Sequence, residues 1–281
     1  MNKLVLSLKH HLTLMLILII LIIGVLGVFG VIRLIGEYGS TVERITEELD
    51  LPFDAEGPYV LLIPRRDGNA LNLNLKRTAS YDAIFYDLVY NAEGIDRGVS
   101  GNVDTNRKKG EYDQEILFGS CSKNVCKYDK GVENGTLTLR IQKGNKLYKM
   151  NTEWHLQKLN VSFGTLNSGD SHFTYKVTFK PAELGLTGFS IVNDLSGVPK
   201  LPSGKKIIGK VYVLNIPIAK NLPPGAVSVE LAENPPSDAK LYRFDEVNGW
   251  KMLDTKIEGS KVSASANGPG IFSVLIEFKQ D

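Results

Sequence analysis

The sequence is poor in the residues that most often carry chemistry. Its 281 residues include two cysteines, four histidines and two tryptophans. A closed zinc site needs about four ligands, and Cys121 and Cys126 have no second pair beside them. The G-x-S-x-G motif that exposes a serine nucleophile is also missing. We therefore predict a protein with no metal site, no catalytic residues and no enzymatic activity.

Charge of one sign is not concentrated anywhere along the chain. Lys and Arg number 33 against 31 Asp and Glu, which gives a formal net charge of +2. Because no basic block occurs, a nucleic acid is not expected as a partner. The hydrophobic share of 43% is ordinary for a globular protein, so a core of normal size can form.

One stretch comes close to a phosphate-binding loop but lacks its last element. "GKKIIGKV", from Gly204 to Val211, fits G-x-x-x-x-G-K and then has valine where the loop needs Ser or Thr. Such a loop also opens a helix, whereas the residues that follow, "YVLNIP", are typical of a strand. We expect a turn that leads into a strand, with no nucleotide or other cofactor.

The most informative segment is a long apolar run near the N-terminus. From Leu12 to Ile32 there is no charge, and Thr13 is the only polar side chain. A helix of about 21 residues spans roughly 31 Å, close to the thickness of the hydrocarbon layer of a bilayer. A cleaved secretory signal is the alternative, but its apolar region is shorter and ends at an A-x-A-like site, which is missing here. Residues 12–32 are therefore predicted to cross a lipid bilayer.

The sequence gives weaker evidence for the orientation of this helix than for its presence. Lys3 and Lys9 precede it, and Arg33 and Arg44 follow it, so the Lys/Arg balance is nearly even. A short N-terminal tail and a large β-rich remainder favour an inner N-terminus. We expect a single-pass cell-membrane protein with a cytoplasmic tail at 1–11 and an extracytoplasmic C-terminal part.

The remainder of the chain is predicted to be all-β after a short helical stalk at 33–51. Apolar and polar residues alternate in "LNLNLKR", "TLTLRIQ", "FTYKVTFK" and "IFSVLIEF", and turn-forming stretches such as "RDGN", "NSGD" and "NGPG" separate such segments. Alternation of this kind is typical of antiparallel strands with one buried face. The length exceeds one seven-stranded sandwich. We predict two antiparallel β-sandwich modules, 52–159 and 160–281.

The C-terminal module has a recognisable pattern. It contains "YVLNIPIAKNLPPGAVSVELAE" and then "AKLYRFDEVNGWKMLDTKIEGSKVSASANGPGIFSVL". Over about residues 207–276 this pattern resembles the ZU5-like β-sandwich modules of surface proteins. The resemblance implies an interaction or structural module, and it carries over no catalytic residues.

The membrane segment has a second resemblance. "LTLMLILIILIIGVLG" is similar to the start of type IV pilins. The chain has His11 where a pilin has a cleavable glycine, and Leu16 where a pilin has glutamate. A pilin-like filament subunit is kept as an alternative function.

Several polar side chains are candidates for a functional site. Glu111, Asp113 and Glu115 alternate, so a strand would place three carboxylates on one face, as a weak Ca²⁺ site or as a solvated surface. Cys121 with His155 and Arg140 contains the residue types of a transpeptidase, but the local motif matches no such family. His155 and His172 are otherwise expected to be ordinary surface histidines.

Two residue types suggest contact with sugars. Trp154 and Trp250 each lie beside an apolar strand pattern, so packing is expected rather than stacking on a glycan. Asn134 in "NGT" and Asn160 in "NVS" fit the N-glycosylation acceptor pattern, near predicted turns.

The predicted topology indicates that the two cysteines form a disulfide. Outside the cytoplasm, paired cysteines oxidise. "EILFGS" and "VCKYD" are predicted to form two strands, so that Cys121 and Cys126 face each other across a hairpin.

The predicted function is a non-catalytic structural, adhesive or ligand-binding role at the cell surface, with a surface protein or a glycan as partner. An envelope enzyme whose site is not visible in the sequence is the further alternative.

Overall fold

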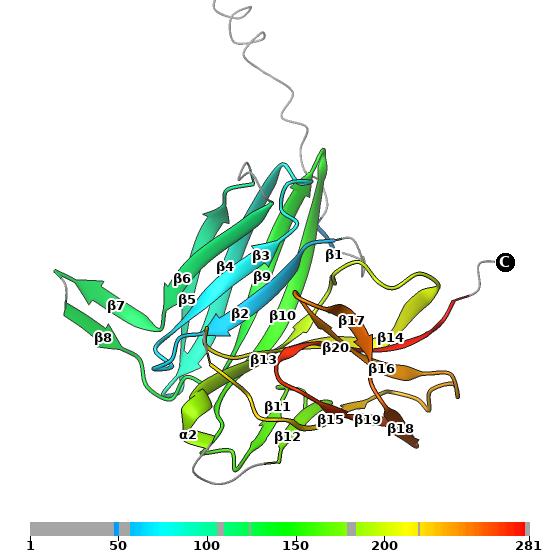
Figure 1. Ribbon diagram of the computed structural model, residues 1–281. Coiled ribbons are helices and arrows are strands. Elements are labelled where there is room, and N and C mark those ends of the chain that lie inside the picture. The colour runs from blue at the N-terminus through cyan, green and yellow to red at the C-terminus, as the bar shows by residue number, and fades with distance from the viewer. Residues whose placement is uncertain are drawn as a thin grey trace, which may run out of the picture. The chain divides into compact units, whose positions relative to one another are not determined.

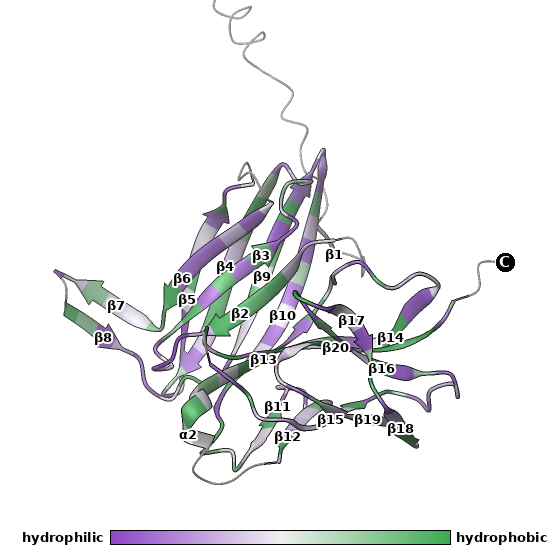
Figure 2. Cartoon of the chain, viewed as in Figure 1, coloured by the Kyte–Doolittle hydropathy of each residue, from purple (hydrophilic) through white to green (hydrophobic). Residues whose placement is uncertain are grey.

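Alternating side chains build most of the strands, and the protein is all-β with several antiparallel sheets. The computed structural model describes residues 48–50, 57–105, 110–123, 125–178, 184–218 and 220–278. Along β3 (Ala70–Lys76), Leu71, Leu73 and Leu75 are buried, as the alternation predicts. Figure 2 shows hydrophilic and hydrophobic bands along several of the strands. The predicted turns also form, and Gly68 in "RDGN" has a φ of 74°, which the glycine adopts without a steric penalty.

The largest sheet has ten strands. Nine follow the order β17-β16-β20-β14-β13-β10-β9-β4-β5, and β1 pairs with β10 beside them (Figure 1). The strands are β1 (Glu48–Asp50), β4 (Ala83–Ala92), β5 (Ile95–Val103), β9 (Asn134–Lys143), β10 (Lys146–Lys158), β13 (Phe189–Leu195), β14 (Lys205–Asn215), β16 (Lys240–Asp245), β17 (Gly249–Met252) and β20 (Gly270–Glu277).

Three smaller sheets accompany it. One is β2-β3-β6, one is β11-β12-β15-β19-β18, and one is the hairpin β7-β8. Their remaining strands are β2 (Tyr59–Pro64), β6 (Glu111–Leu117), β7 (Gly119–Ser122), β8 (Val125–Tyr128), β11 (Thr165–Asn167), β12 (Phe173–Val177), β15 (Gly225–Glu230), β18 (Thr255–Glu258) and β19 (Lys261–Ala266). The helix α2 (Leu184–Thr187) is a single turn.

Two hydrophobic cores lie on opposite faces of the large sheet. The first joins its inner face to β2, β3 and β6, and the second joins the other face to the five-stranded sheet. In β14 the side chains alternate between the cores, with Val211 and Val213 in the first and Tyr212 and Leu214 in the second. The strands β13, β14 and β20 are therefore covered on both faces.

This double coverage corrects the expectation of one wet face for "IFSVLIEF". In β20, Ile271 belongs to the first core and Phe272 to the second, and Ser273 is also buried. Strands buried on both faces have nearly continuous apolar sequences, which alternation alone does not distinguish. The phosphate-loop look-alike is a turn at Gly204 followed by β14, as predicted.

The predicted N-terminal elements mostly lie outside the described residues. These are the cytoplasmic tail 1–11, the membrane helix 12–32 and most of the stalk 33–51. Within the described ranges, no helix has the length and apolar character needed to cross a bilayer.

One part of the stalk prediction is wrong. Glu48–Asp50 is a strand, not a helix, and it pairs in parallel with Leu147–Lys149. The reason lies in β10, whose partner β13 covers only Trp154–Lys158 and so leaves the earlier edge open. Strand β1 supplies hydrogen-bond partners for that edge. Residues Glu47–Asp281 form one compact unit, and their division into two modules near Leu159 stays a prediction.

Candidate functional site

The hairpin β7-β8 is the most isolated part of the described chain. It forms a two-stranded sheet of its own, and Figure 1 shows it projecting from the sheets around it. Cys121 and Cys126 are directly opposite in its register and form the disulfide, as predicted. Val125 is 74% exposed near the tip. Because an isolated two-stranded hairpin is at best marginally stable in water, the disulfide gives this projection a fixed shape.

The base of the hairpin is held by contacts with the first core region. The Arg65 guanidinium lies 5.5 Å from the centroid of the Tyr128 ring, and its Nε and Nη2 donate to the Asp67 carboxylate at 2.8 Å. The Asp129 N–H donates to the Phe118 carbonyl at 2.9 Å. The hairpin therefore leaves the body at a defined position, while β7 and β8 pair with no other described strand.

The two faces of the hairpin differ in chemistry. Side chains of directly opposed residues share a face, so the disulfide lies on the same face as Tyr128. The other face carries Ser120, Ser122, Val125 and Lys127. Lys123 at the turn is exposed as well, and residues 119–128 contain no acidic side chain. The open face is therefore basic and partly apolar.

A hollow of about 540 Å³ lies next to the hairpin base. Its acidic groups Asp67 and Asp129 are already paired, with Arg65 and with Arg97 at 3.3 Å. Among the described residues its two lysines form no ion pair, and Lys158 Nζ lies 5.6 Å from the centroid of the Phe189 ring. The wall of the hollow also includes apolar side chains. The lining of the hollow includes Lys130, Glu133, Lys158, Val161 and Phe189.

Two further hollows have a different character. One of about 210 Å³ is mainly apolar and is lined by Leu61, Ile63 and Phe244 among others. Another of about 390 Å³ lies over β4, β9 and β10, with Asn91 and Glu153 in its lining. Neither is lined by a histidine or a cysteine.

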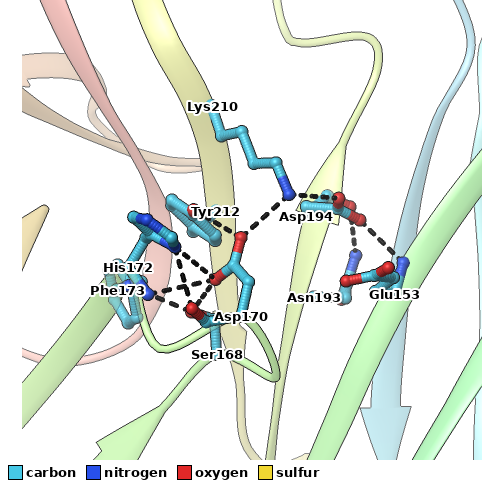
Figure 3. Close-up of polar contacts among 9 residues, drawn as sticks. All are labelled: Glu153, Ser168, Asp170, His172, Phe173, Asn193, Asp194, Lys210 and Tyr212. Atoms are coloured by element: carbon cyan, nitrogen blue, oxygen red, sulfur yellow. Dashed lines mark hydrogen bonds and ion pairs between the residues drawn. The ribbon is translucent and has the colours of Figure 1, made fainter. Parts of the chain in front are cut away.

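A partly buried polar cluster lies where the β11-β12 turn meets β13 and β14 (Figure 3). The Asp170 carboxylate accepts hydrogen bonds from Ser168 Oγ at 2.5 Å, Lys210 Nζ at 2.8 Å and Tyr212 OH at 3.0 Å. It also accepts one from the His172 N–H at 3.1 Å. Burial alone would raise the pKa of Asp170, but these donors outweigh it and hold the pKa well below its usual range.

Asp194 lies on the other side of the same lysine. Its carboxylate is 3.8 Å from Lys210 Nζ and accepts a hydrogen bond from the Glu153 N–H at 2.8 Å. Burial raises the pKa of Asp194 to about 6, because these two contacts compensate only part of the desolvation. Pairs of carboxyl groups with separated pKa values occur in active sites. The contacts of Asp170, Lys210 and Asp194 connect the turn before β12 with β13 and β14, and we call this cluster the polar clasp.

The three carboxylates considered as a calcium site each have partners of their own. On β6, Glu111 pairs with Lys76 at 3.2 Å, Glu115 pairs with Arg65 at 3.3 Å, and Asp113 accepts from Asn72 and Asn74. Among the described residues, no group of three His, Cys, Asp or Glu side chains is placed to hold a metal ion.

The transpeptidase-like set does not assemble. Cys121 is oxidised and has no thiol to act as a nucleophile, and Arg140 pairs with Asp87. His155 Nδ1 lies 2.6 Å from Asn134 Oδ1, and burial lowers the pKa of His155.

The remaining candidates are placed as follows. Trp154 is buried and stacks on Phe118, with 5.7 Å between the ring centroids. The ring centroids of Trp250 and Phe244 are 5.4 Å apart, so both tryptophans pack as predicted. Asn160 is exposed in the turn after β10, and Asn134 is exposed at the start of β9. Glycosylation at either asparagine stays a prediction.

Sequence reasoning missed the polar clasp. In the sequence, Asp170 belongs to the turn "NSGD" and Lys210 to the stretch that resembles a phosphate-binding loop. Neither pattern predicts that the two side chains meet. The signal was an Asp two residues after a turn Ser, a pattern in which side chains hydrogen-bond nearby backbone groups. A search of protein-family models matches none to this chain, and a search of curated proteins finds no match either.

Proposed function

We propose that this protein is a single-pass membrane protein whose extracytoplasmic β-domain has a non-catalytic binding role at the cell surface. The observation that carries the proposal is the projecting hairpin β7-β8, fixed by Cys121–Cys126. A disulfide is expected in an oxidising compartment, which agrees with the predicted anchor at 12–32.

The exposed chemistry of the hairpin favours contact with another molecule. Val125 is 74% exposed, and a large apolar side chain at the tip of a projection contributes nothing to either core. Polar and apolar groups on a rigid loop or hairpin are a common form of binding surface. We further propose that the two cores correspond to two β-sandwich modules that share the large sheet, the second of them ZU5-like.

Photo-crosslinking on intact cells tests this function. The full chain would carry a photoreactive phenylalanine analogue at position 125, and a matched variant would carry it at Val247, which is 92% exposed on another hairpin. A membrane-impermeant biotin reagent applied to the same cells would report whether the β-domain faces outward.

We expect surface biotinylation of both variants and a discrete crosslinked species only from position 125. Protection of the β-domain from the reagent in intact cells would contradict the topology. Equal crosslinking from positions 125 and 247, or none from 125, would contradict a binding role for the hairpin.

A further inference from the structure

We propose that the hairpin β7-β8 and the adjoining 540 Å³ hollow bind an acidic, extended segment of a partner protein. This inference rests on the proposed function and names the chemistry of the partner. It follows from three features of the same surface: its charge, its free strand edges and its apolar wall.

The charge of the surface is positive. Lys123 and Lys127 are exposed on the hairpin, with no acidic residue in 119–128. The hollow at the hairpin base continues this charge with Lys130 and Lys158, which are also exposed. Asp67 and Asp129 are engaged by arginines, which leaves Glu133 as the acidic residue in the described lining of this hollow that forms no ion pair.

The hairpin also offers backbone groups. β7 and β8 pair only with each other among the described strands, so each has an outer edge with no strand beside it. An extended segment that adds to such an edge forms main-chain hydrogen bonds, and its alternate side chains meet the face of the hairpin. Segments with acidic side chains at those positions would meet Lys127, and apolar ones would meet Val125.

The hollow provides the apolar part of the proposed binding surface. Val161 is 66% exposed and lies in its wall with Phe189, whose ring also packs over Gly68. An apolar side chain of the bound segment can be buried there, while Lys130 and Lys158 contact acidic neighbours. Since Asp129 and Lys130 follow β8 directly and line the hollow, the hollow adjoins the base of the hairpin.

A protein segment fits this surface better than two other occupants. Edge lysines are a common device against pairing between identical strands, because two copies would bring their positive charges together. A sulfated polysaccharide would use the lysines but would leave the strand edges, Val125 and Val161 without partners. An acidic extended segment uses all of these features.

The test is a selection from a phage-displayed library of random 12-residue peptides on the purified full chain in nanodiscs. We expect the selected peptides to be acidic, with apolar residues at alternate positions. Their affinity should fall at least about tenfold in the double variant K127E/K130E, since like charges then face each other. The matched control K251E/K256E reverses two exposed lysines on β17 and β18, and it should bind as the unchanged protein does.

Each alternative outcome overturns the inference. Selected peptides without acidic character, or binding unaffected by K127E/K130E, would place recognition elsewhere. Binding of heparin but of no acidic peptide would identify a glycan surface, and self-association abolished by K127E/K130E would identify a second copy as the occupant. Because the selection uses purified protein, it can fail while the cell-surface crosslink from position 125 succeeds, which separates this inference from the proposed function.

Discussion

Replacing Asp194 with asparagine should stabilise the protein at neutral pH. The carboxyl group of Asp194 is mostly buried, and burial raises its pKa from 3.8 to about 6. The folded protein therefore binds the Asp194 proton more tightly than the unfolded chain does. Protonation favours the fold, and this stabilisation is complete below about pH 4 and is lost as the pH rises through about 6.

The magnitude follows from the size of that shift. A change of about two pKa units corresponds to about 3 kcal/mol of lost folding free energy at pH 7.5. Asparagine carries no charge to desolvate, and its Oδ1 can still accept from the Glu153 N–H. The attraction to Lys210 Nζ at 3.8 Å is already included in the pKa of about 6, so its loss is not subtracted a second time. We expect Asp194→Asn to raise the free energy of unfolding by up to about 3 kcal/mol at pH 7.5.

Urea unfolding of the full chain in micelles, followed by tryptophan fluorescence at pH 4 and pH 7.5, measures this effect. The gain should be present at pH 7.5 and absent at pH 4, where the wild-type carboxyl is protonated. Asp170→Asn is the matched control on the other side of Lys210. Because the pKa of Asp170 is lowered, its charge stabilises the fold, and this variant should lose about 2 kcal/mol at pH 7.5. A loss of stability for Asp194→Asn at pH 7.5 would refute the assignment of Asp194 as a penalised buried carboxylate.

Three further changes test the packing of the fold. Removing the disulfide with Cys121→Ser and Cys126→Ser should cost about 2 kcal/mol locally, because the closed ring is small, and hydrogen exchange should accelerate in 119–128 while β3 stays protected. Gly135→Ala should destabilise by about 1–3 kcal/mol in urea unfolding, since its Cβ would lie 2.3 Å from the Val89 carbonyl oxygen and from Trp154 Cζ2, whereas Gly185→Ala, with open space around it, should not. Phe272→Ala should cost about 3–5 kcal/mol in the same assay, because its ring packs on Phe173 at 5.4 Å and on Tyr175 at 6.3 Å, and a wild-type urea midpoint would contradict the second core.

Much of the strand pattern could be predicted because the alternation of side chains is local. Leu71, Leu73 and Leu75 point to one core because successive residues of a strand face opposite sides. The disulfide could be predicted for the same reason, since a hairpin register and an oxidising compartment together determine that Cys121 faces Cys126. Both inferences need only neighbours in the sequence.

The sharing of one sheet by two cores could not be predicted, because it depends on residues far apart in the chain. Val213 and Leu214 are adjacent, yet one packs with β2 and β3 while the other packs with β15 and β19. An apolar run of this kind indicates burial but does not say which layers cover it. The clasp has the same origin, since Asp170, Asp194 and Lys210 come from three separate segments and meet only when the sheets pack.

The same distinction between local and long-range order bears on the hairpin β7-β8. Its shape is local, because four cross-strand pairs and one disulfide determine it. Its position is long-range, because Arg65, Asp67 and Phe118 hold its base. A projection that is fixed in both respects can bind without first ordering itself, which lowers the entropic cost of association. The rigidity of this hairpin, together with its lysines and its exposed valine, is therefore the strongest physical reason to regard it as a binding surface.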